Sequence, residues 1–468
     1  MSELNVVDPF IALRPIDDGA LPGEALCFVG LTSYATDCVA GELQRQMRLE
    51  GAATDAEIIA ATSEIRKAEL VSLGAMAVTA AHNEDNSTQR EIVERFNALS
   101  AEIYPRPTAT SLMRVVSELH ASIGPNDGAL TEERTEFFDF LEEVEGLVER
   151  QFAPNKQAED RLAVAARHDM HGAMREAFMD AHGSVIEAIE SDWVAIRRNP
   201  ERPQAFLPDD ILKIYKRDLE RLAKDDHESW VDWAAILESD AGGYRTWSHD
   251  HKIFSAGKSR PFSLMETVNL VPHEMYVHAL RGNNGERYGI AEQAEYPNFE
   301  EGYGVLIGEA MSGYKSTAGA FYYLATVLAR GDLGHTFTRV QLFRARELNI
   351  MLQRAACQKE GLGRDIGDPS DSVEIQKLAA RAVNRIIKLE GQPAQDIPPM
   401  VFTYDTTYHA GLEDAECFAI AALKRGHAAS DILRYLELGH FSPVKSSDRE
   451  YVHGRLRTLG KSDWIVEV

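Results

Sequence analysis

Helical periodicity runs through most of the chain, and the alternation that is typical of strands is sparse. Apolar residues that recur every three or four positions indicate helices with one buried face. Several of these stretches begin with a capping box, in which Ser, Thr or Asp is followed three residues later by Glu (Thr54, Ser263, Asp371 and Ser447). The run 244–260 has mixed aromatic residues and stops at Pro261, which favours a short strand pair or an edge strand. The sequence therefore predicts a mainly α fold with a small β element, in the α+β class.

The 468 residues are 44% hydrophobic, which is ample for a large core. No linker is long or polar enough to force a domain boundary. The most plausible domain boundary lies near Pro200, Pro203 or Gly242. It gives an N-terminal helical half over 1–240 and a C-terminal half over 241–468, which carries the motif described below. One compact unit is the alternative.

The charge balance is strongly acidic, with 74 Asp and Glu against 49 Lys and Arg. Such a surface repels phosphate backbones, so we expect no nucleic-acid partner. The four cysteines are scattered without a CxxC pair and indicate reduced thiols (Cys27, Cys38, Cys357 and Cys417). We see no signal peptide, and no stretch approaches the ~20 apolar residues of a membrane span. The expected protein is cytoplasmic, with no membrane partner.

Residues 273–278 read His-Glu-Met-Tyr-Val-His, and residues 299–304 read Phe-Glu-Glu-Gly-Tyr-Gly. Two imidazoles, one acidic ligand and a further carboxylate are the groups with which zinc hydrolases hold their ion and activate water. In the common motif the histidines are four residues apart. Here they are five apart, and on a straight α-helix the two side chains would diverge by roughly 140°. A π-type turn nearly eclipses residues i and i+5, and Pro272 loosens the helix there, so we predict such a turn at the motif.

Glu274 is placed to take a proton from the attacking water and pass it to the leaving amine. The third ligand should be an acidic residue on the next element, where Glu300 and Glu301 both fit; the other carboxylate could hold a histidine N–H. These residues by themselves leave the choice between Glu300 and Glu301 open. The plain alternative is a chance motif whose histidines only satisfy hydrogen bonds in the core.

The ordered set of motifs resembles the zinc tyrosine-carboxypeptidase family, which includes bacterial QEGLA-motif proteins and animal enzymes that remove the C-terminal tyrosine of tubulin. The family pattern is HExxxH, then Glu-Glu-Gly, then an Arg-Gly segment and an FTKD-x-x-Y-x-x-G-L block. Residues 381–385 (Arg-Ala-Val-Asn-Arg) and 402–412 (Phe-Thr-Tyr-Asp-Thr-Thr-Tyr-His-Ala-Gly-Leu) are similar to the last two. Residues 101–107 are similar to the family's Tyr-Gly-x-Pro segment. The matches follow the family order.

This resemblance implies a helical, zincin-like metallopeptidase whose catalytic half is 241–468. It implies a Zn²⁺ ion held by three ligands, a catalytic glutamate, and a supporting carboxylate (His273, His278 and Glu301; Glu274; Glu300). It also implies removal of a C-terminal residue, tyrosine or another aromatic, from a peptide or protein. An arginine fork suits the terminal carboxylate, and the candidates for substrate binding are one arginine and two tyrosines (Arg385, Tyr404 and Tyr408). Further arginines are Arg344, Arg346 and Arg381, and a solvated helix face is the alternative for each.

The chain departs from the family pattern at three positions. Tyr276 replaces a small residue, Tyr303-Gly304 replaces Leu-Ala, and Tyr404 replaces the lysine of FTKD. These changes keep the ligands but affect the substrate pocket, so the preference for tyrosine is an extrapolation. We expect Tyr276 to pack in the core.

Two other histidine groups are weaker candidates. His168 and His171 share a predicted helix without a third ligand, which favours a solvated face. His249 and His251 flank Asp250, either in a polar turn or in a loop that reaches the active cleft. The rival functions are an aminopeptidase or dipeptidyl-peptidase with the same zinc core, and a catalytically inactive scaffold that binds peptides. The natural substrate and the oligomeric state do not follow from the sequence.

Overall fold

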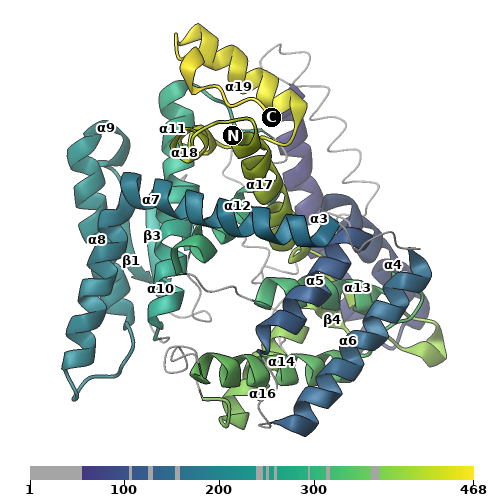
Figure 1. Cartoon of the computed structure of the whole chain (residues 1–468). Coiled ribbons are helices and arrows are strands. Elements are labelled where there is room, and N and C mark those ends of the chain that lie inside the picture. Colours follow the sequence, from purple (N-terminus) through teal and green to yellow (C-terminus); the bar gives the residue numbers. More distant parts are fainter. Residues whose placement is uncertain are drawn as a thin grey trace. The chain divides into compact units, whose positions relative to one another are not determined.

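The structure is a computed structural model that is mainly helical with two small sheets, as the sequence predicts (Figure 1). It describes residues 55–104, 108–124, 130–152, 159–238, 246–248, 252–257, 261–293, 296–312, 317–359 and 368–468. Among these residues, no helix combines the length and the apolar character that crossing a membrane requires.

The chain forms two compact units that interleave in sequence. Unit 1 comprises the described parts of Met1–Pro154, Thr317–Ala356 and Asp368–His409, and unit 2 those of Asn155–Ser316, Cys357–Gly367 and Ala410–Val468. This division differs from the expected boundary at residue 240, because segments from both sequence halves contribute to each unit.

Unit 1 consists of helices around a two-stranded sheet. Its helices are α3 (Asp55–His82), α4 (Asn86–Ile103), α5 (Ala109–Ser122), α6 (Thr131–Gln151), α13 (Thr317–Arg330), most of α14 (Arg339–Lys359) and α16 (Ser372–Ile386). Strands β4 (Ile387–Leu389) and β5 (Met400–Val401) pair antiparallel, with the 3₁₀ turn η3 (Pro393–Gln395) between them. One core gathers residues of α5, α6, α13 and α14, and a second gathers α3, α4 and the segment around β5.

Unit 2 surrounds the histidine motif with helices. Its first helices are α7 (Glu159–Arg198), α8 (Pro208–Asp225) and the short α9 (His227–Trp230). The motif lies in α10 (Leu264–Val271), η2 (Pro272–Ala279) and α11 (Leu280–Tyr288), followed by α12 (Tyr296–Ser312). The last elements are α17 (Thr406–Lys424, from Ala410 onward), α18 (Ala429–Leu436), α19 (Ser446–Thr458) and η4 (Ser462–Trp464).

The small sheet of unit 2 has the strand order β1-β3-β2. Strand β3 (Ile253–Gly257) pairs parallel with β1 (Ala234–Glu238) and antiparallel with β2 (Thr246–Ser248), and α8 packs on β1 and β3 (Figure 1). Two of these strands fall in the run 244–260, so the predicted strand element there is confirmed.

The helix starts follow the predicted capping signals in two cases. Ser263 forms a full capping box with Glu266, and Asp371 accepts a hydrogen bond from the Glu374 N–H. Ser447 is a correction: α19 already begins at Ser446, so Ser447 lies inside the helix. Thr54 lies outside the described residues. Helix α7 runs without interruption from Glu159 to Arg198.

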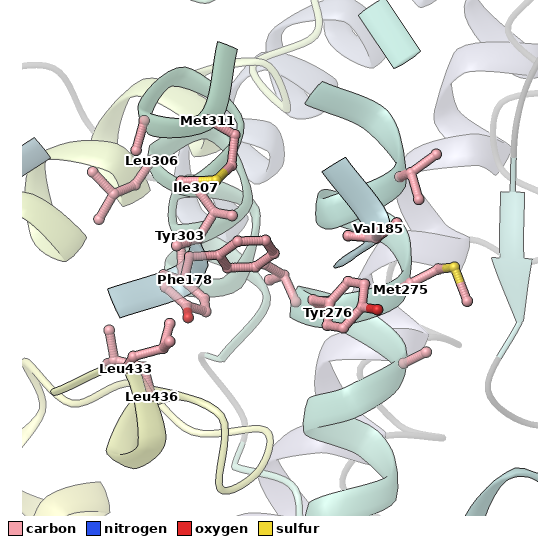
Figure 2. Packing of buried hydrophobic residues seen from close by; sticks show 14 of the residues in the cluster. Phe178, Val185, Met275, Tyr276, Tyr303, Leu306, Ile307, Met311, Leu433 and Leu436 are labelled. Atoms are coloured by element: carbon pink, nitrogen blue, oxygen red, sulfur yellow. The ribbon is translucent and has the colours of Figure 1, made fainter. Parts of the chain in front are cut away.

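The core of unit 2 places α12 against the motif. Helix α12 packs on α7, α10 and η2. Its side chains Tyr303, Leu306, Ile307 and Met311 are buried in the core of unit 2 (Figure 2). Helices α12 and α17 approach so closely that a Cβ on Gly302 would lie 1.8 Å from the carbonyl carbon of Gly411. Glycine at both positions therefore sets the distance between these helices, and with it the depth of the Glu-Glu pair.

Candidate metal centre

The histidine motif lies in a π-helix, Pro272–Ala279, which continues α10 and leads into α11. Pro272 is the first residue of this π-helix. The ring centroids of His273 and His278 are 4.7 Å apart, which a straight α-helix would not allow at this spacing. The π-type turn that the five-residue spacing predicts is confirmed.

Three side chains converge beside this helix. His273, His278 and Glu301 each offer one ligand atom, and these atoms lie within 4.8 Å of one another. Glu301 Oε2 is 3.3 Å from His273 Nε2 and 3.9 Å from His278 Nε2. Ligand atoms at tetrahedral zinc, each about 2.1 Å from the ion, are about 3.4 Å apart. The donor set and its spacing fit a zinc ion.

Glu300 has a different place from Glu301. Its Oε1 accepts a hydrogen bond from His278 Nδ1 at 2.5 Å, and its Oε2 accepts one from Arg281 Nη1 at 2.7 Å. Arg281 is fully buried and also donates to the carbonyl oxygen of Phe441. With Nδ1–H directed at Glu300, the lone pair of His278 Nε2 faces the Glu301 side. Glu300 therefore supports a histidine, and Glu301 is the ligand candidate.

The carboxylates give this centre an excess of negative charge. Burial by itself lowers the pKa of His278, but Glu300, Glu301 and Glu274 outweigh it and raise that pKa to about 9. Burial raises the pKa of Glu300, whereas His440, Arg281 and His278 bring it down to about 2. The pKa of Glu301 is also lowered, because its contacts with His273 and His278 outweigh burial. A cation among these groups is therefore favoured.

Gly304 makes room for the first histidine. A Cβ at this position would lie 2.3 Å from His273 Nδ1, which is far inside van der Waals contact. Glycine at this position thus has a local reason: the imidazole of His273 occupies the space that a side chain on residue 304 would need.

Tyr276 packs in the core of unit 2, as expected. It is fully buried, and its hydroxyl donates to Asp218 while Arg221 donates to the hydroxyl oxygen. Its ring contacts Phe178 of α7 (Figure 2) and His182 of the same helix. Burial and the charge of Asp218 raise the pKa of the Tyr276 phenol, so it stays protonated and acts as a donor.

The three predicted substrate-binding residues lie together in unit 1, whereas the metal centre belongs to unit 2. Arg385 Nε pairs with the buried Asp405 at 2.7 Å, and the guanidinium lies over the ring of Tyr408. Tyr404 and Tyr408 make an edge contact with centroids 5.7 Å apart. We call Arg385, Asp405, Tyr404 and Tyr408 the arginine group. The Arg385 side chain is 37% exposed.

The other arginine candidates have ordinary partners. Arg344 pairs with Glu136 and Glu347 on the surface, and Arg381 is exposed. Arg346 is buried, donates to Asn349 and lies over the ring of Phe321.

The other histidine candidates divide similarly. His171 Nε2 forms a hydrogen bond of 3.0 Å with Glu416 Oε1, while His168 is exposed. His249 and His251 lie outside the described residues.

Sequence reasoning missed Arg281 and His440. His440 stacks on Tyr296 with parallel rings, and its Nε2 is 3.5 Å from Glu300 Oε2. The available signal for Arg281 was its position three residues after the second histidine, in a stretch of buried helix. His440 follows His278 by 162 residues, and no local pattern marks it.

The structure thus brings His273, His278 and Glu301 together in unit 2, with Glu300 behind His278 and Glu274 in the same π-helix. It brings Arg385, Tyr404 and Tyr408 together in unit 1. Comparison of the chain with family models, with curated proteins and with solved structures gave no match.

Proposed function

We propose that the protein is a zinc-dependent, zincin-like metallopeptidase. The observation that carries this proposal is the convergence of His273, His278 and Glu301 from two elements, η2 and α12, on one point. The π-helix supports it, because that rare conformation is the one that lets a five-residue spacing serve a single ion. Core histidines that only satisfied hydrogen bonds would not require it.

The residues of the centre have separate roles in peptide hydrolysis. When bound, a zinc ion supplies Lewis acidity, which activates water and polarises a peptide carbonyl. Glu274 is half-buried and close enough to raise the pKa of His278. In the proposed reaction it takes the proton of the attacking water and gives it to the leaving amine. Glu300 and Arg281 keep His278 oriented throughout.

The finer assignment is a carboxypeptidase that removes a C-terminal residue, tyrosine or another aromatic, from a peptide or protein. It rests on the motif resemblance and on the arginine group. Asp405 holds the guanidinium of Arg385 by its Nε, and an arginine held in this way suits a carboxylate. The scattered cysteines make the cytoplasm the proposed compartment.

The test combines metal analysis with a peptide library. Purified protein should contain about one zinc ion per chain, and mass spectrometry should show loss of single C-terminal residues that a chelator abolishes. Loss of N-terminal residues would favour the aminopeptidase alternative. Metal-free, folded and inactive protein would favour the scaffold and overturn the proposal.

A matched pair of variants tests the role of Glu274. Glu274→Gln should keep zinc and lose hydrolysis, since the amide cannot accept the proton. Glu286→Gln removes an exposed carboxylate of α11 in the same way, and its hydrolysis rate should equal that of the unaltered protein. Activity retained in Glu274→Gln would remove this residue from its role.

A further inference from the structure

The π-helix η2 lies between the α-helices α10 and α11. Because the π-type hydrogen-bond pattern is rare in proteins, contacts with neighbouring elements are expected to stabilise it. Two of its buried side chains reach different neighbours. His278 is held by Glu300 of α12. Tyr276 is held by α8 and α7, which lie elsewhere in sequence and carry no proposed ligand.

The hydroxyl of Tyr276 closes a triangle with two residues of α8. It donates to Asp218 Oδ2, Arg221 Nη2 donates to its oxygen, and Arg221 Nε donates to Asp218 Oδ1 at 2.8 Å. Asp218 is only 4% exposed. A buried carboxylate is costly without donors, so this triangle strongly favours one position of the Tyr276 hydroxyl.

The ring and the hydroxyl of Tyr276 restrain different movements. The ring packs against Phe178 and His182, with centroids 5.6 Å and 4.5 Å away, which sets the distance between η2 and α7. The hydroxyl sets the rotation of η2 about its axis. Changing the register by one residue would turn the side chain by about 100° and would take the hydroxyl away from Asp218.

We infer that Tyr276 is a positioning residue whose hydroxyl, held by Asp218 and Arg221, keeps the π-helical register that aims His273 and His278 at one metal ion. This inference rests on the proposed zinc site. It gives a function to the bulky residue that replaces a small one inside the motif. Tyr276 acts through the helix and does not touch the ion.

The experiment removes one hydroxyl at Tyr276 and one at a matched control. Tyr435 is also fully buried in unit 2, and its hydroxyl lies 3.0 Å from His453 Nε2. Tyr276→Phe and Tyr435→Phe each delete a single buried hydrogen-bonding group. Both variants are compared with the unaltered chain by zinc affinity in chelator competition, by the visible absorption spectrum of bound Co²⁺, and by thermal unfolding without metal.

Tyr276→Phe should weaken zinc binding by about 10- to 100-fold, the usual loss when a residue that orients a ligand is removed. Its Co²⁺ spectrum should also change, because the spectrum follows ligand geometry. Tyr435→Phe should lower the unfolding temperature while both metal readouts keep their original values. Asp218→Asn, which keeps an acceptor oxygen, should give an intermediate loss and replaces Tyr276→Phe if that variant does not fold.

Wild-type affinity and spectrum in Tyr276→Phe would overturn the inference. An equal loss in Tyr435→Phe would also overturn it, because the effect would then be a general loss of stability. A failure of the proposed function is distinguishable, since it would appear as absence of stoichiometric zinc binding in the unaltered chain.

Discussion

The proposed metal centre of unit 2 and the surroundings of the arginine group in unit 1 both contain buried charged groups, but their charge imbalances have opposite signs. In the metal centre, Glu274, Glu300 and Glu301 raise the pKa of His278 to about 9 although burial opposes this. Carboxylates outnumber the one buried guanidinium there, that of Arg281. Added positive charge is therefore stabilised in this region.

Around the arginine group of unit 1, positive charges are in excess. Burial lowers the pKa of Lys388, Asp405 partly offsets this, and Arg385 and Arg339 add to the lowering, which gives a value of about 8. Cations thus outnumber the one buried carboxylate of Asp405. The comparison teaches that the two regions favour added charge of opposite sign, positive in unit 2 and negative in unit 1. These are the signs that the proposed metal ion and the proposed peptide carboxylate require.

The largest predicted effect comes from replacing Glu301, the proposed acidic ligand of the metal ion. Glu301→Gln keeps the size of the side chain but deletes an anionic ligand, so zinc affinity should fall by more than the roughly 10- to 100-fold typical of a supporting residue. Glu300→Gln should stay within that range. Isothermal titration with Zn²⁺ measures both. A larger loss in Glu300→Gln than in Glu301→Gln would reverse their assigned roles.

Arg281→Met should have the next largest effect. It leaves Glu300 buried without the guanidinium 2.7 Å away, which costs about 3–5 kcal/mol of unfolding free energy. Arg287→Met in the same helix removes an arginine that is 53% exposed, and surface pairs contribute about 0–1 kcal/mol. Urea unfolding compares the two. Equal losses of unfolding free energy in the two variants would show that the buried Arg281–Glu300 pair contributes no more than the surface arginine.

Gly304→Ala should act on the ligand without removing a charge. The new Cβ would lie 2.3 Å from His273 Nδ1, so the imidazole must move and zinc affinity should fall. A Cβ on Gly172 of α7 meets no atom within 4 Å, so Gly172→Ala should raise stability by about 0.5–1 kcal/mol. Metal titration and thermal unfolding separate the two outcomes; unchanged affinity in Gly304→Ala would mean that His273 tolerates a shift.

The last predicted effect is a pH dependence in unit 1, confined to alkaline pH. The pKa of Lys388 is about 8 in the folded protein and about 10.4 in an unfolded chain. Between these values the unfolded state binds more protons, so the contribution of Lys388 to stability rises with pH and is lost as the pH falls. Lys388→Met should flatten this part of the profile of unfolding free energy against pH. A steeper rise in the variant would contradict the assignment.

The histidine motif of the candidate metal centre could be predicted from the sequence more fully than the residues that pack around it. The five-residue spacing of His273 and His278 required a π-type turn, because no straight helix lets both reach one ion. Local periodicity and capping likewise sufficed for the mainly helical class. These are properties of contiguous residues, which is why they could be predicted.

Long-range partners could not be predicted in the same way. Tyr276 meets Asp218, 58 residues earlier, and Arg281 meets the carbonyl of Phe441, 160 residues later. Such pairs follow from how helices pack, not from any local pattern. The interleaved division into two units has the same origin, since segments such as Thr317–Ala356 join helices from the start of the chain.

The π-helix has an evolutionary consequence. Deleting one residue between Glu274 and His278 would restore the four-residue spacing of the widespread motif, and an ordinary helix would then align both histidines. The same deletion would leave the later residues of that helix facing as they do now, because five residues of π-helix and four of α-helix each make about one turn, and Arg281 would still face Glu300. The buried arginine is therefore compatible with either spacing, and the two features are expected to vary independently in descent.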